Sequence, residues 1–569
     1  MRGLPTVAVT LALVTPVPGF AAEHWVDPSA PMGGDGSREA PFDTIDAVLE
    51  GAGAGDTVWL ETGDYGELSI SGLVPEERLT LAAADAAEPR FSRVQLQDSA
   101  NVTLRGLHVA GEAAGTLMEL DGEELVVEAC VLMSAPDTTD WSAQDWIDRA
   151  STGIEVSGTV NTVRDNYLLN VGYGISVSAT HSLIEGNVIE NFSRDGLRGL
   201  GDYTVFQYNT VKNCYAVDDH HDDGFQSWSE GDEGVGTGEV TGIVLRGNTI
   251  INYEDPNQPY RGTLQGIGCF DGTFVDWVIE NNVVMTDHWH GITLLGARNC
   301  TVVNNTVIDL NDESPGPPWI SVDDHKDGTQ PVDCVVRNNL TTDLANSSAV
   351  IEEGNIVLSM TELADYFVDA AAHDLHLLEA APAVDAGLAA SPALDRDRIP
   401  RPQGAGIDVG AYEWHEPGVG AEGGNGGAAS SNASMASSAT SGAGAPGQGG
   451  AQGQGGASGQ GGTAAPTSSA ESGPDSSATG SSTASGGSGG TTPDAGHNSD
   501  SSGSDSGAGG CGCRMLLPAR LPASASALFL IVVSGLAWRR RGRGAFAKRR
   551  SSTTRTPNQP SESALEPAD

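Results

Sequence analysis

The chain has 569 residues and a formal net charge of −47, with 76 acidic side chains against 29 Lys and Arg. A surface this acidic repels phosphate backbones, which excludes nucleic acid as a partner. Seven cysteines in so long a chain do not make a dense disulfide framework.

The first 22 residues have the pattern of a secretory signal peptide. Arg2 precedes an apolar run from Val7 to Val14, and small residues end the segment at Ala21 and Ala22. We therefore expect cleavage after Ala21 or Ala22 and export of the mature protein.

Asparagine recurs at one point of a short apolar phrase, such as Glu185-Gly-Asn-Val-Ile. The spacings are 21, 22, 39, 34, 23 and 34 residues. A period near 22 with insertions is typical of a solenoid, whose units bury their apolar faces only by stacking. Stacked strands lie ~4.8 Å apart, so the amides can hydrogen-bond to one another, and asparagine tolerates the left-handed turn conformation. The series is Asn166, Asn187, Asn209, Asn248, Asn282, Asn305 and Asn339.

A glycine followed by an apolar residue recurs in phase with these asparagines. Gly153, Gly174 and Gly196 each precede the next asparagine by 13 residues, and the series continues at Gly224, Gly266 and Gly291. The two ladders predict an all-β fold, a single-stranded right-handed parallel β-helix over residues 23–415 with about ten to twelve coils. A β-sandwich with asparagine turns is the alternative.

Both ends of this domain resemble known proteins. His24-Trp-Val-Asp-Pro and Gly55-Asp-Thr-Val-Trp-Leu resemble the N-terminal segment of secreted β-helix proteins of the pectate-lyase-like superfamily, and Arg401-Pro-Gln-Gly-Ala-Gly resembles their closing segment. The resemblance covers about Glu23 to Glu413. It implies that a short helix, here about Thr44 to Glu50, caps the solenoid. The superfamily contains lyases, hydrolases, epimerases and non-enzymes, so the resemblance does not set the activity.

The C-terminal part has a different composition. Residues 416–510 are almost all Gly, Ser, Ala, Gln and Thr, which predicts a disordered linker. Residues 511–545 hold Cys511-Gly-Cys-Arg, an apolar run at the lower length limit of a transmembrane helix, and an arginine cluster. This order resembles the myxobacterial C-terminal sorting signals, which implies display at the cell surface; a plain single-pass anchor is the alternative. Residues 546–569 are expected to be a disordered tail.

Three segments exceed the repeat, at 137–150, 230–239 and 255–263, and loops that protrude from a rigid scaffold usually carry function. Alignment of the glycine ladder brings histidines, arginines and carboxylates together on adjacent coils, a pattern typical of acid–base sites. The catalytic candidates are His220, His221, Asp222, Asp223, Arg194, Arg198, His288 and His290. The substrate-binding candidates are Gln226, Trp228, Arg261, Gln265 and Phe270, of which Trp228 and Phe270 offer aromatic faces to sugar rings.

The leading hypothesis is a surface-anchored polysaccharide lyase or uronate epimerase acting on an acidic polysaccharide. β-Elimination requires a neutralised carboxylate, a base for the C5 proton and an acid for the leaving oxygen. We expect Arg194 and Arg198, or a Ca²⁺ ion, to neutralise the carboxylate. His221 or His220 is the expected base and His290 or His288 the expected acid.

Three alternatives stay open: an inverting glycoside hydrolase on the same fold, a non-catalytic glycan-binding or adhesive surface protein, and a decorated turn that binds Ca²⁺ without chemistry. The oxygen-rich turns favour Ca²⁺ over zinc, with Asp195, Asp222 and Asp223 as candidate ligands. Val322-Asp-Asp-His-Lys-Asp-Gly is a candidate second cation site, and the family resemblance makes Lys326 a further candidate base.

Three cysteines lie in phase with the asparagine ladder. Cys300 and Cys334 each precede a ladder asparagine by five residues and are expected on adjacent coils, either bonded or free. Cys130 takes the place of a ladder asparagine and is expected to be buried. A capped solenoid on a flexible linker predicts a monomer.

Overall fold

The computed structural model describes residues 21–416, apart from residues 50, 52, 54, 112–114 and 312. The predicted signal peptide up to residue 20, the linker beyond residue 416, the cysteine motif with its apolar run, and the tail lie outside these residues. Within the described part, no helix is long and apolar enough to cross a membrane.

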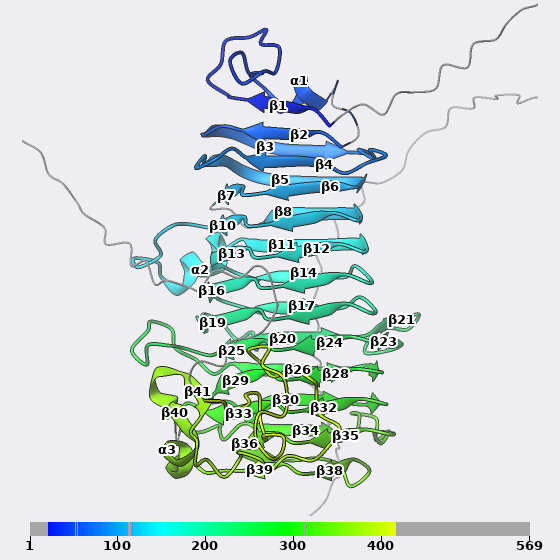
Figure 1. Ribbon diagram of the computed structural model, residues 1–569, viewed down its shortest axis with the longest axis vertical. Helices are drawn as coiled ribbons and strands as arrows, with labels where there is room; N and C mark the ends of the chain where they lie inside the picture. The colour runs from blue at the N-terminus through cyan, green and yellow to red at the C-terminus, as the bar shows by residue number, and fades with distance from the viewer. Residues whose placement is uncertain are drawn as a thin grey trace, which may run out of the picture. The chain divides into compact units, whose positions relative to one another are not determined.

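Short parallel strands stack into an all-β solenoid with three faces (Figure 1). The first face is a sheet of 13 strands, one to each coil, which slightly exceeds the expected number of coils. Its strands are β1 (Glu23–Val26), β2 (Thr57–Leu60), β4 (Leu79–Ala83), β6 (Val102–Arg105), β9 (Val126–Glu128), β12 (Thr162–Arg164), β15 (Leu183–Glu185), β18 (Val205–Gln207), β24 (Val244–Arg246), β28 (Val278–Glu280), β32 (Thr301–Val303), β35 (Val335–Arg337) and β38 (Ile351–Glu353).

The second and third faces are stacks of parallel strands joined through β5, which pairs with strands of both. The second face holds β7 (His108–Ala110), β10 (Val131–Met133), β13 (Tyr167–Val171), β16 (Val188–Phe192), β19 (Thr210–Cys214), β25 (Thr249–Ile251), β29 (Val283–Thr286), β33 (Thr306–Asp309), β36 (Leu340–Thr341) and β39 (Ile356–Val357). The third face holds β3 (Gly63–Ser71), β5 (Pro89–Ala100), β8 (Thr116–Glu123), β11 (Thr152–Thr159), β14 (Ile175–Val177), β17 (Leu197–Gly199), β20 (Asp223–Trp228), β26 (Gln265–Asp271), β30 (His290–Leu295), β34 (Trp319–Asp323) and β37 (Asp343–Leu344).

The ladder asparagines lie at the corner between the first and second faces. In each step one Nδ2 donates to the Oδ1 of the next asparagine, at 2.9–3.0 Å, and the backbone N–H donates to the same oxygen. The ladder extends by one further member, Asn355. Cys130 occupies the position before Asn166, to which its backbone N–H donates. The expected stack of buried amides is confirmed.

The expected backbone conformation of the ladder is wrong in one respect. The left-handed residue is the one before each asparagine, for example Tyr208 at φ 56° and Gly247 at φ 61°. The asparagine itself turns its amide into the corner, while its predecessor makes the turn. This is why the preceding position holds Gly, Asn or Asp in most copies.

The ladder glycines lie at the corner between the second and third faces, where steric room decides the residue. A Cβ on Gly174 would lie 2.2 Å from the carbonyl oxygen of Gly196, and one on Gly224 would lie 2.4 Å from Ile250 Cγ2. Adjacent coils approach too closely here for any side chain. The interior is filled by apolar side chains from all three faces, in one continuous cluster from Val26 to Val336.

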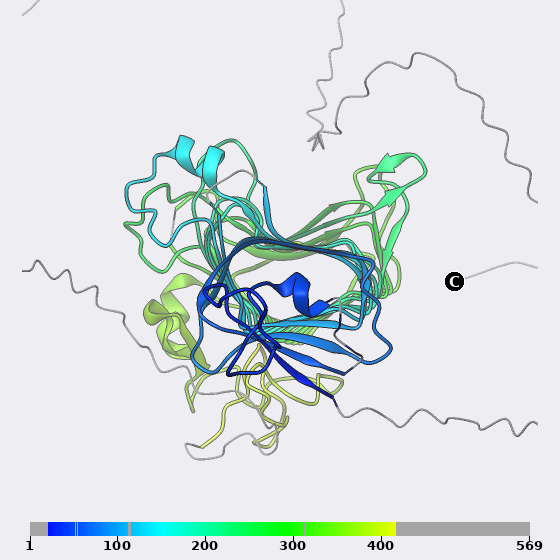
Figure 2. The same cartoon turned by 90° about the horizontal axis from the view of Figure 1, so that it is seen from above.

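The N-terminal end is closed as expected by a helix, α1 (Ile45–Leu49), which lies across the solenoid opening and buries Ile45 and Val48 (Figure 2). The C-terminal segment differs from its expected role as an end cap. Residues 385–413, which we call the strap, run along the outside of the asparagine corner, where Asn338 Nδ2 donates to Leu388 O and Asn281 Nδ2 donates to Leu394 O. Three left-handed corner residues, Asn281, Asn304 and Asn338, donate their side-chain amides to backbone oxygens of the strap.

His376 fixes the strap to the strand β41 (Asp374–Leu377), and this contact predicts a pH dependence of stability. Its Nε2 lies 2.7 Å from Asp397 Oδ2 and its Nδ1 lies 2.6 Å from Asp374 Oδ1. The two carboxylates, Asp397 above all, raise the pKa of His376 from 6.5 to about 9. A raised folded-state pKa contributes stability that is fully present below about pH 6.5 and is lost as the pH rises through about 9.

We expect the melting temperature of wild type to fall over this pH window, and that of His376→Gln to fall less, because glutamine carries no proton to lose. Thermal melts at about pH 6, 7.5 and 9.5 measure the two slopes. Equal slopes in the two proteins would show that His376 does not couple stability to pH.

Candidate functional site

The third face carries an outward column of residues in register across six coils. The order is Ser176, Arg198, Gln226, Gly268, Thr293 and Ser321. The first five are the alignment that the glycine ladder predicts. We call the surface around this column the strip, and it comprises Tyr173, Arg194, Asp195, Arg198, residues 220–228, Gln265, Gly268, Phe270, residues 288–290, Thr293 and Trp319.

Two insertions project beside the strip (Figure 2). The helix α2 (Ala143–Arg149) comes just before β11, and the hairpin of β21 (Glu230–Gly231) and β22 (Gly234–Val235) comes just after β20. Trp146 of α2 stacks on Tyr215 with 4.6 Å between ring centroids, and Tyr260 of the third insertion donates its hydroxyl to Trp141 O. The strands of the strip therefore begin beside α2 and end at the hairpin. The first and third predicted insertions are in contact with each other.

His221 and Asp223 form the centre of the strip. His221 Nδ1 lies 3.1 Å from Asp223 Oδ2, and Gln226 Nε2 donates to the same oxygen at 2.9 Å. The Asp223 side chain is fully buried, while that of His221 is 40% exposed. The other carboxyl oxygen, Asp223 Oδ1, is buried without a hydrogen-bond partner, and a Cβ on Gly268 would lie 2.2 Å from it. Glycine at this column position leaves room for the carboxyl group.

Arg198 lies one coil from Gln226 and is held on three sides. Its Nε donates to Asp195 Oδ2 at 2.6 Å, and its guanidinium carbon lies 3.9 Å from the ring centroid of Tyr173 and 5.3 Å from that of Trp228. Asp195 is itself buried and accepts the backbone N–H of Asp223 at its second oxygen. The predicted arginine and the central pair are thus joined through one carboxylate.

The neighbouring predicted residues form separate pairs. His220 Nδ1 lies 3.3 Å from Asp222 Oδ1, and Arg194 donates to Asp218 Oδ2 at 2.9 Å. Asp222 contacts His220 and Asp223 contacts His221, so the two neighbouring aspartates have different histidine partners. Both arginines of the strip are therefore paired with aspartates before any ligand arrives.

Burial changes the protonation of the central carboxyl groups. Burial first, and then the nearby Asp195 and Asp222, raise the pKa of Asp223 to about 8, against the opposing effect of His221. Burial also raises the pKa of Asp222 to about 6. Since Asp223 and His221 share a hydrogen bond, the protonation of one group depends on that of the other.

The histidines at the C-terminal end of the strip, His288 and His290, do not suit the predicted role of general acid. Burial lowers the pKa of His288 and that of His290 to about 4 each. Neutral imidazoles at neutral pH have no imidazolium proton to give to a leaving oxygen. His290 is in contact with Phe270, with 4.8 Å between ring centroids.

Some predicted residues lie apart from the centre. Trp228 pairs with Asp271 and not with Phe270, because a bulge follows Ser227. Arg261 donates to Glu313 at 2.9 Å and is therefore engaged at the edge of its insertion. Gln265 does lie next to Asp223 in register, and its buried Oε1 has no hydrogen-bond partner.

The carboxylates predicted to bind Ca²⁺ have other partners in the structure: Asp195 holds Arg198, Asp222 contacts His220 and Asp223 contacts His221. Among the described residues, no group of three or more His, Cys, Asp or Glu side chains is arranged to hold a metal ion. At the predicted second cation site, Lys326 Nζ pairs with Asp271 Oδ1 at 2.6 Å. Calcium binding stays a prediction.

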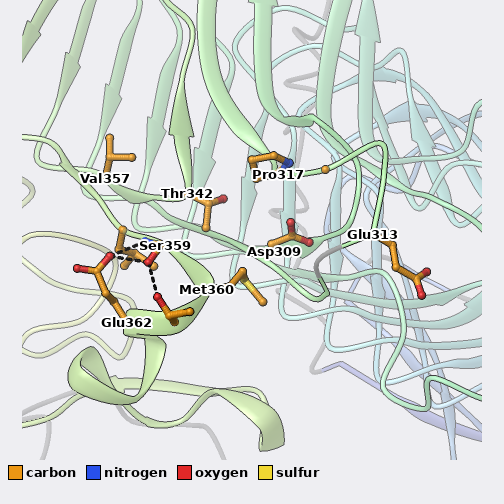
Figure 3. A pocket seen from close by; sticks show the side chains of 11 residues that line it. Asp309, Glu313, Pro317, Thr342, Val357, Ser359, Met360 and Glu362 are labelled. Carbon is orange, nitrogen blue, oxygen red and sulfur yellow. Dashed lines mark hydrogen bonds between the residues drawn. The ribbon is translucent and has the colours of Figure 1, made fainter.

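A cavity of about 540 Å³ lies elsewhere, near the helix α3 (Leu363–Tyr366), and shares no lining residue with the strip. Asp309, Thr342 and Met360 line it, with Glu362 hydrogen-bonded to Ser359 at its edge (Figure 3).

Cys300 and Cys334 do lie on adjacent coils as expected, and both are free thiols.

Four residues of the strip were not among the site residues proposed from the sequence, although the glycine ladder placed Tyr173 and Thr293 in its columns. Tyr173 precedes a ladder glycine, so its column position was visible, but a tyrosine there has no chemical signal of its own. Thr293 and Trp319 contact His290, and Trp289 contacts His288. Trp319 could not be found because no glycine–isoleucine phrase marks its coil.

Comparisons with known proteins agree with this architecture. Residues 152–315 match the family described as "Right handed beta helix region". No curated protein matches the chain. Among solved structures, the chain is similar to pectate lyase Pel9A, with 16% identity over 70% of this chain and 97% of that chain and a TM-score of 0.37.

Two further solved structures are similar at the same low level. The alginate lyase AlyGC has 14% identity over 59% of this chain and 51% of that chain, with a TM-score of 0.35. The A-module of the Azotobacter vinelandii mannuronan C-5 epimerase AlgE6 has 13% identity over 55% of this chain and 93% of that chain, with a TM-score of 0.36. Likeness at this level does not decide an activity. The family match and the strand register together show that the described part of the chain contains a right-handed parallel β-helix.

Proposed function

We propose that the strip is the active site of a carbohydrate-active enzyme, a lyase or epimerase that moves the C5 proton of a uronic acid in an acidic polysaccharide. The observation that carries the proposal is the pair of His221 and Asp223 next to the buried ion pair of Arg198 and Asp195. A base held by a buried carboxyl group, beside a guanidinium, is what proton abstraction next to a carboxylate requires.

His221 is the proposed base. Asp223 holds its Nδ1, so the opposite nitrogen, Nε2, is the one that exchanges a proton with the substrate. After His221 takes the C5 proton, the C4–O bond breaks and a double bond forms between C4 and C5. The imidazolium then returns its proton to the leaving oxygen, so that one residue serves both steps. An epimerase instead replaces the C5 proton from the opposite face of the ring.

Arg198 is the proposed partner of the substrate carboxylate. The rings of Tyr173 and Trp228 fix the guanidinium plane, and a planar guanidinium is suited to bidentate recognition of a carboxylate. Because Asp195 already balances its charge, an added cation would strengthen the binding of a polyanion. For this reason Ca²⁺ remains part of the proposal.

A second candidate, the inverting glycoside hydrolase, is favoured by one specific observation. The pKa of Asp223 and that of Asp222 are raised, as in a carboxyl group that protonates a glycosidic oxygen. The two chemistries give different products, which makes the choice between them experimental.

The test is a product assay on residues 23–415 with a panel of polyuronates, with and without Ca²⁺. We expect absorbance from the unsaturated product of a lyase, or deuterium incorporation at C5 in D₂O from an epimerase. New reducing ends without a double bond would identify the hydrolase. Binding of a polyuronate with none of these products would contradict an enzyme and favour a glycan-binding surface protein.

We also propose that the protein is exported and held at the cell surface, on the strength of the signal-like N-terminus and the C-terminal sorting pattern in its sequence. The capped solenoid is the ground for proposing a monomer. A protease applied to intact cells should then release the β-helix domain. Recovery of the domain only after cell lysis would contradict surface display.

A further inference from the structure

Two tryptophans at the C-terminal end of the strip present an aromatic surface. Trp289 is 40% exposed, and its ring stacks on that of Trp319 with 6.3 Å between centroids and 26° between planes. The backbone N–H of Trp319 donates to Trp289 O at 2.8 Å, which ties the two residues together. We call this pair the tryptophan platform. An indole ring that is exposed to this extent beside polar residues is suited to stacking on a ligand, whereas a ring that stabilises the core is buried.

Hydrogen bonds fix the platform and one of the two imidazoles beside it. Trp319 Nε1 donates to Thr293 Oγ1 at 3.1 Å, and Thr293 Oγ1 lies 2.9 Å from His290 Nδ1. The Thr293 hydroxyl accepts the indole N–H and still has both a donor and an acceptor position for the contact with His290 Nδ1. His288 Nδ1 likewise accepts the backbone N–H of His290. The neutral imidazole of His288 therefore carries its proton on Nε2.

The chemistry at this end differs from that at the other end of the strip. Burial lowers the pKa of His288 and that of His290 to about 4, so neither adds positive charge at neutral pH. The N-terminal end of the strip instead holds Arg194 and Arg198. Ring faces and neutral N–H donors match the apolar face and the hydroxyl groups of a pyranose, whereas the guanidinium groups match its carboxylate.

The register gives the distance between the two ends. Trp319 pairs with His290, and three coil steps separate Trp319 from Asp223. At ~4.8 Å for each step this is about 14 Å, which is longer than one sugar ring. We propose that the tryptophan platform is a distal subsite that stacks on a sugar ring of the same polysaccharide chain, several residues away from the one beside His221. The inference rests on the proposed function and deepens it, because it makes the substrate a polymer.

The test uses Trp289→Ala, Trp289→Phe and, as a matched control, Tyr203→Ala, which removes an exposed ring outside the strip. The probes are oligouronates of about two and about eight residues, prepared from the polymer that gives product in the panel. For Trp289→Ala we expect KM to rise about tenfold for the long probe, with kcat unchanged and the short probe unaffected. Trp289→Phe should recover most of the loss, and the control should behave as wild type.

An unchanged KM for the long probe would overturn the platform, and so would an equal rise for both lengths, which indicates a general disturbance of the site. Neither result affects the proposed function, which depends on His221. If no polymer gives product, the proposed function fails by itself. Tryptophan fluorescence titration with alginate and polygalacturonate then tests the platform separately: binding lost in Trp289→Ala supports it, and binding retained overturns it.

Discussion

Replacing His221 with alanine will lower kcat/KM on the polyuronate substrate by about 10³-fold or more, because general base catalysis contributes 10² to 10⁴ and the same residue is proposed to return the proton. Steady-state kinetics by ultraviolet absorbance measures the loss. His181→Ala, which removes an exposed imidazole outside the strip, should retain wild-type kinetics.

The Asp223→Asn variant separates orientation from proton transfer. Its amide preserves the shape of the side chain but holds no proton for the His221 pair, so the pH profile of kcat/KM should lose the limb that belongs to the coupled pair. Activity of His221→Ala close to that of wild type would remove His221 from the mechanism. If the pH profile of kcat/KM were unchanged in Asp223→Asn, the pair of Asp223 and His221 would not be part of the mechanism.

The largest effect on stability is expected from the asparagine ladder, in Asn248→Ala. Asn248 Oδ1 accepts both the backbone N–H and the amide of Asn209, and its Nδ2 donates to Phe206 O and to Asn282 Oδ1. Alanine removes all four of these bonds. Asn209 Nδ2 keeps Ile184 O and Asn282 Oδ1 keeps the backbone N–H of residue 248, but the backbone N–H of Asn209 loses its hydrogen bond. A buried group left without a partner costs about 1–3 kcal/mol. We expect a net loss of about 3–5 kcal/mol in the free energy of unfolding.

Urea unfolding followed by circular dichroism measures this loss. Asn257→Ala, which changes an exposed asparagine of the third insertion, should cost less than about 0.5 kcal/mol. If Asn248→Ala also lost less than about 0.5 kcal/mol in the free energy of unfolding, the ladder amides would set the register of the coils but contribute little stability.

The sequence predicted the solenoid well because its signal is periodic. Asn187 and Gly174 recur in phase for steric and hydrogen-bonding reasons that act in every coil, so each copy reinforces the prediction. The strap along the asparagine corner was mistaken for an end cap. Its contacts, such as Arg398 with Glu185, join residues that are 213 positions apart and have no periodic signal.

The candidate site was predicted in part for the same reason. The glycine ladder placed Arg198, Gln226 and Gly268 on one column, as the register confirms. It did not reveal that Asp195 already holds Arg198, since a side-chain rotamer is not visible in a repeat. Nor did it reveal the bulge after Ser227 that moves Trp228 away from Phe270.

The strap also determines how the domain bears mechanical load. Solenoids unravel from their ends, because an end coil has a neighbour on one side only. Close to the last described residue, Ala411 bonds Thr306 and Glu413 pairs with the buried Arg401. A pull on the chain beyond residue 416 is therefore delivered sideways, to coils inside the stack, and the last coil is bypassed. The domain resists such a pull by shear across several coils at once, where peeling of the terminal coil would release one strand at a time.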